Sequence, residues 1–171
     1  KKIIRRKKAG ERNEGSLLEN AITILETENC LHKIPDLKNY GEEKEDQLFS
    51  VGLELCITWI NRILFLKLLE AQLLKYHKNN TAYRFLNFGN LPQYDEVYKL
   101  FFQVLARRYN ERSEKVQKKF SHVPYLNSSL FEFSDMEDAT IKINMLDDTA
   151  ELPLIPSTVL RNDKNKPKAD K

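Results

Sequence analysis

The sequence predicts a mainly α-helical protein, a helical bundle with two long helices and a small C-terminal β hairpin. First, five Gly and six Pro in 171 residues are too few for the many turns of sandwiches and barrels. Second, apolar residues recur at helical spacing over two long stretches. Third, 41% hydrophobic residues supply a core, and the chain length suits one domain.

The first helix is expected between residues 13 and 28. Ser16 suits its N-cap, and Glu19, three residues later, completes the pattern of a capping box. Pro35 and Gly41 then indicate a loop. The apolar residues at helical spacing within this helix are Leu17, Leu18, Ala21, Ile24 and Leu25.

The first long helix is expected at about residues 45–76, where apolar side chains surround most of the helix. A helix of this kind is either buried or spans a membrane. A span needs about 20 apolar residues with few charges, whereas four charged residues interrupt this run: Glu54, Arg62, Lys67 and Glu70. We therefore predict a central core helix and no membrane partner.

The second long helix is expected at residues 94–120, after a linker at residues 79–93. It ends before Pro124, because the residue before a proline disfavours the helical conformation. Its apolar seam consists of Val97, Phe101, Val104 or Leu105, Tyr109, Val116 and Phe120.

The C-terminal part changes its period. Ile141, Ile143 and Met145 alternate with polar residues, as in a half-buried strand. The Asp147-Asp148 pair suits a turn, and residues 152–159 would return as an edge strand because they contain two prolines. The sequence therefore predicts a β hairpin element within residues 136–160.

The net charge of +3 is unevenly distributed along the chain. Residues 1–12 carry +6 and residues 161–171 carry +3, so the segment between them carries −6. We expect a basic, extended N-terminal segment (1–15), a helical connector domain (16–135), the β element (136–160) and a basic polar tail (161–171). The chain starts without Met and ends in a polar run, which indicates a piece of a longer protein.

Few residues suggest catalysis or metal binding. Two cysteines, Cys30 and Cys56, cannot form a disulfide framework, which favours a cytoplasmic protein. Cys30 and His32 lie close together, but no second ligand pair follows at zinc-site spacing. We therefore predict no catalytic, cofactor-binding or metal-ligating residue in this chain.

One near-match to a metal-dependent nuclease stays open as an alternative. The Pro35-Asp36 pair followed by Glu42-Glu43-Lys44 mimics an acidic pair and a lysine around a divalent metal. That chemistry needs carboxylates converging from adjacent strands, and residues 37–41 lack the alternation of a strand. A solvated loop is the favoured interpretation.

The second long helix carries the candidate binding residues. Arg108, Arg112, Lys115 and Lys119 form a stripe without an acid of its own, and Arg107 lies beside it. Uncompensated cations over three helical turns can follow a phosphate backbone. A solvated helix face is the alternative.

Three stretches together resemble the helical region of single-chain type II restriction–modification enzymes of the Bacteroidetes-type branch. They are LELCITWINRILFLKLLEAQLL (53–74), LFFQVLARRYNERSEKVQKKFSHVPYLNSSLFE (100–132) and TIKINMLDDTAELPLIPSTVL (140–160). The most specific part is the decapeptide VPYLNSSLFE (123–132), in which many members have two glycines where Ser128 and Ser129 stand.

This resemblance implies a parent protein that methylates adenine in DNA and cleaves DNA, using S-adenosylmethionine and Mg²⁺. The family's methyltransferase has a Gly-containing cofactor loop and an Asn-Pro-Pro-aromatic motif, and this chain contains neither. The chain therefore matches a non-catalytic, DNA-proximal helical connector. Its implied partners are the methyltransferase and nuclease domains of the same polypeptide and double-stranded DNA. A purely structural scaffold between domains, without DNA contact, is the alternative.

Overall fold

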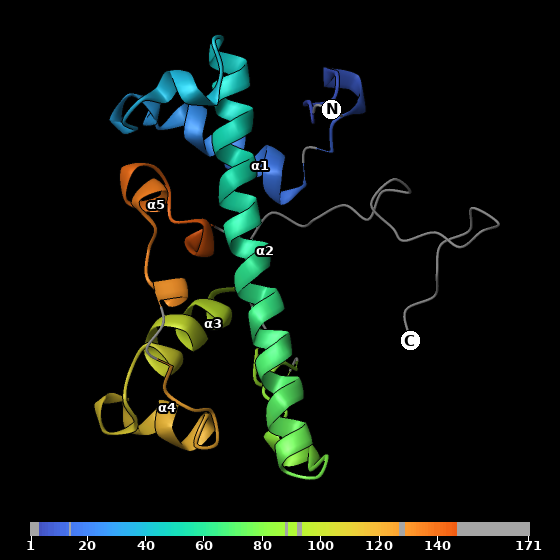
Figure 1. The fold of residues 1–171 in the computed structure, drawn as a ribbon, viewed down its shortest axis with the longest axis vertical. Helices are drawn as coiled ribbons and strands as arrows, with labels where there is room; N and C mark the ends of the chain where they lie inside the picture. Colours follow the sequence, from blue (N-terminus) through green and yellow to red (C-terminus); the bar gives the residue numbers. More distant parts are fainter. Residues whose placement is uncertain (1–3, 14, 88, 92–93, 127–128, 147–171) are drawn as a thin grey trace, which may run out of the picture.

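The computed structural model describes residues 4–13, 15–87, 89–91, 94–126 and 129–146, and these are mainly helical, as predicted (Figure 1). No strand occurs among them. Short 3-10 turns join most of the helices, and α3 continues directly into a π-helix at Leu100–Leu105. The α-helices are α1 (Leu17–Thr27), α2 (Lys44–Tyr76), α3 (Tyr94–Lys99), α4 (Glu114–Lys119) and α5 (Asp135–Ala139).

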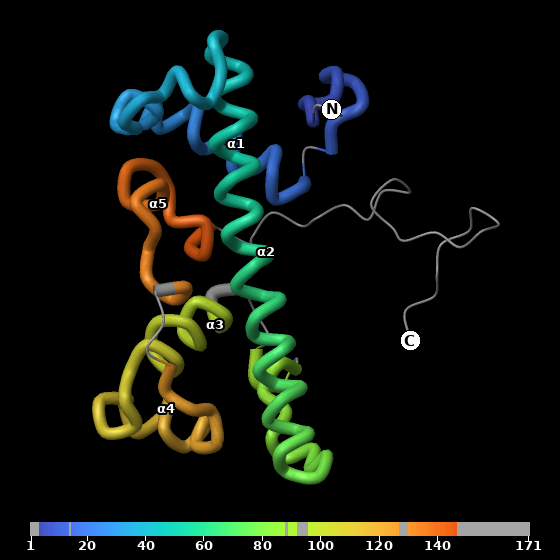
Figure 2. The backbone as a smooth tube through the Cα atoms, in the orientation of Figure 1, coloured from blue at the N-terminus to red at the C-terminus, as the bar shows by residue number. Residues whose placement is uncertain are grey.

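Helix α2 is the axis of the molecule, and it confirms the long helix predicted at residues 45–76. Its 33 residues extend for about 50 Å, because an α-helix rises 1.5 Å per residue. Figure 2 shows α1 beside the N-terminal half of α2, and α5, α3 and α4 following one another along the same axis.

Two hydrophobic cores lie along α2. The first packs the N-terminal half of α2 against α1, the loop after α1, and the segment that follows α5. The second packs the C-terminal half of α2 against the π-helix and the chain on either side of it. The largest fully buried side chains of the second core are Phe85, Phe101, Phe120, Phe131, Leu66, Leu100 and Leu105.

The predicted N-cap of α1 is confirmed, but the capping box is only half formed. The Ser16 hydroxyl accepts a hydrogen bond from the Glu19 backbone N–H at 3.2 Å. The Glu19 carboxylate instead accepts hydrogen bonds from the Arg6 guanidinium, with 2.5 Å between Arg6 Nη2 and Glu19 Oε2. This ion pair raises the pKa of Arg6 and ties the basic N-terminal segment to α1.

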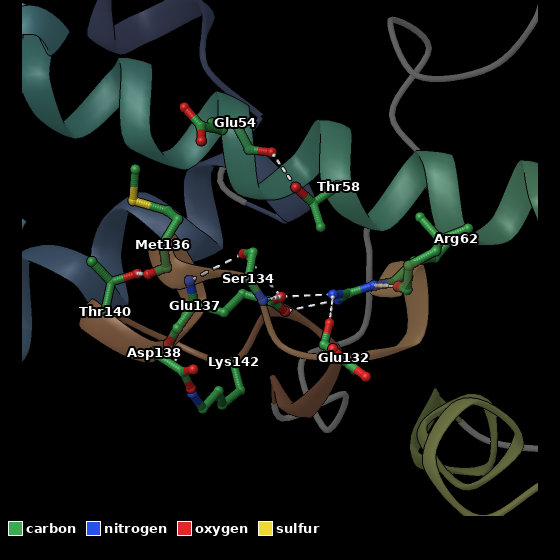
Figure 3. A network of polar contacts seen from close by, with 11 residues as sticks. Glu54, Thr58, Arg62, Glu132, Ser134, Met136, Glu137, Asp138, Thr140 and Lys142 are labelled. Carbon is green, nitrogen blue, oxygen red and sulfur yellow. Dashed lines mark hydrogen bonds and ion pairs between the residues drawn. The ribbon is translucent and has the colours of Figure 1, made fainter. Parts of the chain in front are cut away.

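A buried arginine joins α2 to the C-terminal segment between the two cores (Figure 3). Arg62 is 1% exposed, and its guanidinium forms a two-pronged ion pair with Glu137, with N···O distances of 2.8 and 2.7 Å. It also donates to the carbonyl oxygens of Leu130 and Glu132. Glu137 in turn accepts hydrogen bonds from the backbone N–H and the hydroxyl of Ser134, the N-cap of α5.

The prediction of one long helix over residues 94–120 is wrong. The π-helix ends at Leu105, and Arg108, Arg112 and Ser113 are extended, so that a 3-10 turn and α4 follow as separate pieces. Arg112 lies seven residues after Leu105, so a continuous helix would direct its guanidinium along the apolar seam. The break instead lets this side chain reach backbone carbonyls, as described below.

The predicted β hairpin is also not formed in the described residues. Ile143–Met145 is a 3-10 turn, and Ile141 and Ile143 both pack into the first core. A strand needs a partner for its backbone groups, and the described part of the chain provides none here. The proposed return strand, residues 152–159, lies outside the described residues.

By length and composition alone, α2 is the one described helix that could cross a membrane. Its most apolar 18-residue window has a mean hydropathy of 1.5 and is 39% buried. A core helix of a soluble protein meets the same criterion. Core packing along both halves of α2, with Glu54, Asn61 and Lys67 on its exposed side, favours the core helix.

The first prediction concerns the close contact between α1 and α2. A Cβ at Gly52 would lie 2.9 Å from Ile22 Cγ1, well inside van der Waals contact. Gly52→Val should therefore lower the free energy of unfolding by about 1–3 kcal/mol, as expected for overpacking. Gln72→Val, at an exposed position of the same helix, should change it by less than about 0.5 kcal/mol. Urea denaturation measures both, and equal effects would contradict the tight contact.

The second prediction concerns the buried ion pair. Arg62→Met and Glu137→Gln should each cost about 3–5 kcal/mol of unfolding free energy, because each leaves a buried charge without its partner. The double variant should cost clearly less than the sum of the two. Asp138→Asn, which breaks the exposed pair with Lys142 one residue away, should cost at most about 1 kcal/mol. Additive losses at Arg62 and Glu137 would show that the two side chains are not coupled.

Candidate nucleic-acid interface

The candidate cations lie in the irregular segment between the π-helix and α4. Ala106 is the C-cap of the π-helix, and Arg107 and Arg108 follow at an exposed turn. A 3-10 turn at Tyr109–Glu111 comes next, and the Glu111 carboxylate accepts the Arg108 backbone N–H at 3.1 Å. The two arginines therefore project from a turn whose backbone is hydrogen-bonded.

Arg112 does not lie on an exposed stripe. The residue is 4% exposed, and its Nη1 donates to the carbonyl oxygens of Val123 at 2.8 Å and Phe120 at 3.4 Å. Its Nε donates to the Arg107 carbonyl at 3.1 Å. Burial lowers the pKa of Arg112. The buried Arg112 side chain holds the turn by donating to backbone carbonyls. It is not placed to reach a phosphate.

Lys119 is also engaged within the protein. Its Nζ lies 3.1 Å from Glu96 Oε2, while Lys99 lies 2.5 Å from the other oxygen of the same carboxylate. The hydrogen bond from Lys99, and then that from Lys119, lower the pKa of Glu96. The Glu96–Lys119 pair therefore joins α3 to α4.

Arg107, Arg108 and Lys115 are exposed, and the described residues provide no ion-pair partner for them. Tyr109, 51% exposed, stands beside the two arginines, with its ring centre 5.8 Å from the Arg112 guanidinium carbon. The structure thus leaves three of the five predicted cations on the surface, at one turn and the first turn of α4. The other two, Arg112 and Lys119, have structural roles.

The decapeptide at residues 123–132 runs between the two buried arginines. Arg112 donates to the carbonyl of its first residue, Val123, and Arg62 donates to the carbonyls of Leu130 and Glu132 in its last part. Ser128 lies outside the described residues, and Ser129 begins a 3-10 turn. In this structure the decapeptide therefore connects the α4 region to α5.

The other positions considered for chemistry do not form a site in the described residues. Cys30 is buried, whereas His32 is exposed and its Nδ1 lies 2.8 Å from the Asn29 carbonyl oxygen. Asp36 has a left-handed backbone conformation in a turn. No group of three or more His, Cys, Asp or Glu side chains that could hold a metal occurs in the part of the chain that the structure describes.

The sequence pattern does not reveal the roles of the buried charges Arg62 and Glu70, which interrupt the apolar run of α2. Glu70 Oε2 accepts the backbone N–H groups of Phe85 and Leu86 at 2.8 and 2.7 Å, which holds the chain where it returns along α2. A charged residue within an otherwise apolar run is the feature of the sequence that could have indicated a buried, paired charge.

The chain was compared with protein families, curated proteins and solved structures. A family model described as a domain of unknown function (DUF7814) matches residues 1–171. No curated protein and no solved structure matches the chain.

The third prediction separates the structural arginine from an exposed one. Arg112→Met should lower the free energy of unfolding by about 1.5–3 kcal/mol, because buried carbonyls are left without a charged donor. Arg112→Lys should recover little of this stability, since a lysine lacks the forked donor geometry. Arg108→Met is the matched control and should stay within about 0.5 kcal/mol. Chemical denaturation measures all three, and a neutral Arg112→Met would refute the supporting role.

Proposed function

We propose that this chain, which belongs to the DUF7814 family, is a non-catalytic helical connector that lies beside DNA in a type II restriction–modification protein. The single observation that carries the DNA contact is the exposed turn with Arg107 and Arg108, followed by Lys115 in the first turn of α4. The assignment to a restriction–modification protein rests on the resemblance of three stretches described above.

The hydrogen bonds that hold the backbone of this turn support the proposal. Ordering a flexible loop costs conformational entropy at the moment of binding. Here the Arg112 guanidinium and the Glu111 carboxylate already hold the backbone of the turn through hydrogen bonds. Arg107 and Arg108 are therefore presented on a preformed support, from which they can approach neighbouring phosphates.

The contacts proposed here position DNA and do not read its sequence. Phosphate contacts carry no direct sequence information. Three exposed cations add only a modest, salt-sensitive attraction. In the parent protein, sequence recognition, S-adenosylmethionine binding and Mg²⁺-dependent cleavage would belong to the methyltransferase and nuclease domains, and the assembly would be cytoplasmic.

A second candidate function is a purely structural scaffold between domains. Two observations favour it: Arg112 is buried against carbonyl oxygens, and Lys119 is paired with Glu96. Two of the four cations of the predicted stripe, Arg112 and Lys119, thus serve the fold. In this case the connector would fix the spacing of neighbouring domains without touching DNA.

The fourth prediction tests the DNA contact with the full chain. Replacing Arg107, Arg108 and Lys115 together by alanine should weaken binding to duplex DNA, and by the same factor for unrelated sequences. The slope of log K against log salt should flatten by roughly 0.9 for each phosphate that the variant no longer neutralises. Fluorescence anisotropy with two duplexes of different sequence, over a series of salt concentrations, measures both quantities.

The control removes the same charge from elsewhere on the surface. Lys33, Lys38 and Lys78 are exposed and lie outside the turn and α4. Replacing these three by alanine should change affinity and slope much less. Equal effects of the two triple variants would mean that binding reports only net charge. Unchanged binding of the first variant would favour the scaffold.

A further inference from the structure

A cavity of about 320 Å³ lies between the basic N-terminal segment, residues 4–13, and the packed helices α1 and α2. Leu18 of α1 and Phe49 and Leu53 of α2 form its apolar wall. Pockets for small molecules begin at about 300 Å³ and combine apolar walls with a few polar groups. This cavity therefore has room for a small organic molecule with an apolar body.

Ion pairs hold the N-terminal segment beside the cavity. Arg6 pairs with Glu19 of α1 and Arg12 pairs with Glu45 of α2, with N···O distances of 2.5 and 2.7 Å. Arg6 Nη1 also lies 3.5 Å from the Glu45 carboxylate. Arg12 Nε donates to the Lys7 carbonyl oxygen at 2.8 Å, which closes the segment on itself. The cavity is therefore formed before a ligand enters it, which lowers the cost of binding.

The lining of the cavity carries an excess of positive charge. Its charged side chains are Arg5, Arg6, Lys7, Glu11, Arg12 and Glu19. The ion pairs above neutralise Arg6 and Arg12. Among the described residues, Arg5 and Lys7 have no ion-pair partner, and Glu11 is the one lining carboxylate without a cation. Two unpaired cations against one carboxylate favour an anion, and hydrogen bonds between ionised groups are the strong ones.

Asn13 adds a hydrogen-bonding requirement to the same cavity. Its Oδ1 is buried and has no donor among the described residues, although Asn13 lines the cavity and is partly exposed. A buried acceptor without a donor is costly. A rotation about the Cβ–Cγ bond exchanges the amide oxygen and nitrogen, so that this oxygen can accept a hydrogen bond from a molecule in the cavity. A ligand with an N–H or O–H donor would recover the cost.

From the apolar wall, the two unpaired cations and the amide without a partner, we propose that this cavity binds a small organic anion with an apolar body and a hydrogen-bond donor. The body packs against the apolar wall, and the anionic group lies near Arg5 and Lys7. The site is separate from the proposed DNA contact, because the N-terminal segment lies near one end of α2 and α4 near the other (Figure 1).

Two fluorescent probes that differ only in charge test the site. Anilinonaphthalene sulfonate combines a sulfonate, aromatic rings and an N–H donor, and phenylnaphthylamine is the same molecule without the sulfonate. Fluorescence titration of the full chain measures the affinity for each. The wild-type protein should bind the sulfonate at one site, with a dissociation constant on the order of 10–100 μM, as the size of the probe allows.

Variants of the lining separate the two contributions. Arg5→Ala together with Lys7→Ala should weaken binding of the sulfonate at least about threefold and change binding of the neutral amine less than about twofold, because only the sulfonate carries charge. Asn13→Ala should weaken binding of both probes by the same factor, about threefold or more, because both donate through N–H. These three side chains form no hydrogen bond or ion pair in the described structure, so each variant should fold, which circular dichroism confirms.

Two controls lie outside the cavity. Lys75→Ala together with Lys78→Ala removes the same charge at the C-terminal end of α2 and should leave both affinities unchanged. Ile60→Asp alters the exposed aliphatic face of α2, where Ile60 is 52% exposed, and should also leave them unchanged.

Three outcomes would overturn the proposal. The first is no saturable binding of the sulfonate probe up to about 500 μM. The second is an equal loss of both probes in the variant that lacks the Arg5 and Lys7 side chains, because the cations would then not bind an anion. The third is binding that Ile60→Asp abolishes and Asn13→Ala leaves unchanged, which would place the probe on α2 outside the cavity. None of these outcomes depends on whether the chain binds DNA.

Discussion

The ion pair between Arg62 and Glu137 determines how the two halves of this protein are joined. It lies between the two cores, and its guanidinium also binds two carbonyls of the segment before α5. Removing two charges from water is costly, so this arrangement is stable only when the remaining donors and acceptors are satisfied. Because Arg62 is in the middle of α2 and needs Glu137 and the two carbonyls as partners, α5 and the segment before it lie at the middle of α2, where the two cores meet.

The same principle recurs wherever an irregular segment packs against a helix. Glu70 binds two backbone N–H groups after α2, Arg112 binds three carbonyls around α4, and Arg6 pairs with Glu19 at the start of the chain. Buried backbone groups need partners, and a long charged side chain supplies several at once. Charged side chains therefore satisfy here many backbone groups that sheets and regular turns satisfy in other folds.

This use of charge changes how the surface should be interpreted. A count of basic residues along the chain suggests a continuous cationic stripe, but two members of that stripe are engaged within the protein. Two features of the described surface remain: a turn with Arg107 and Arg108 whose backbone is hydrogen-bonded, and an aliphatic face along α2. The proposed DNA contact uses the turn, whereas the aliphatic face lies on a separate element, α2.

By itself, the sequence determined the features that depend on neighbouring residues. The N-cap at Ser16, the helix after it and the 33-residue α2 follow from capping and from helical periodicity, which act within a few turns. Only the tertiary structure decided the break after Leu105, the burial of Arg112 and the 3-10 turn where a strand was expected. These depend on carbonyls and cores that are distant along the chain, such as Val123 for Arg112 and the first core for Ile143. A local pattern cannot contain that information, because whether a charged side chain faces water or a backbone carbonyl depends on which segments the fold brings beside it.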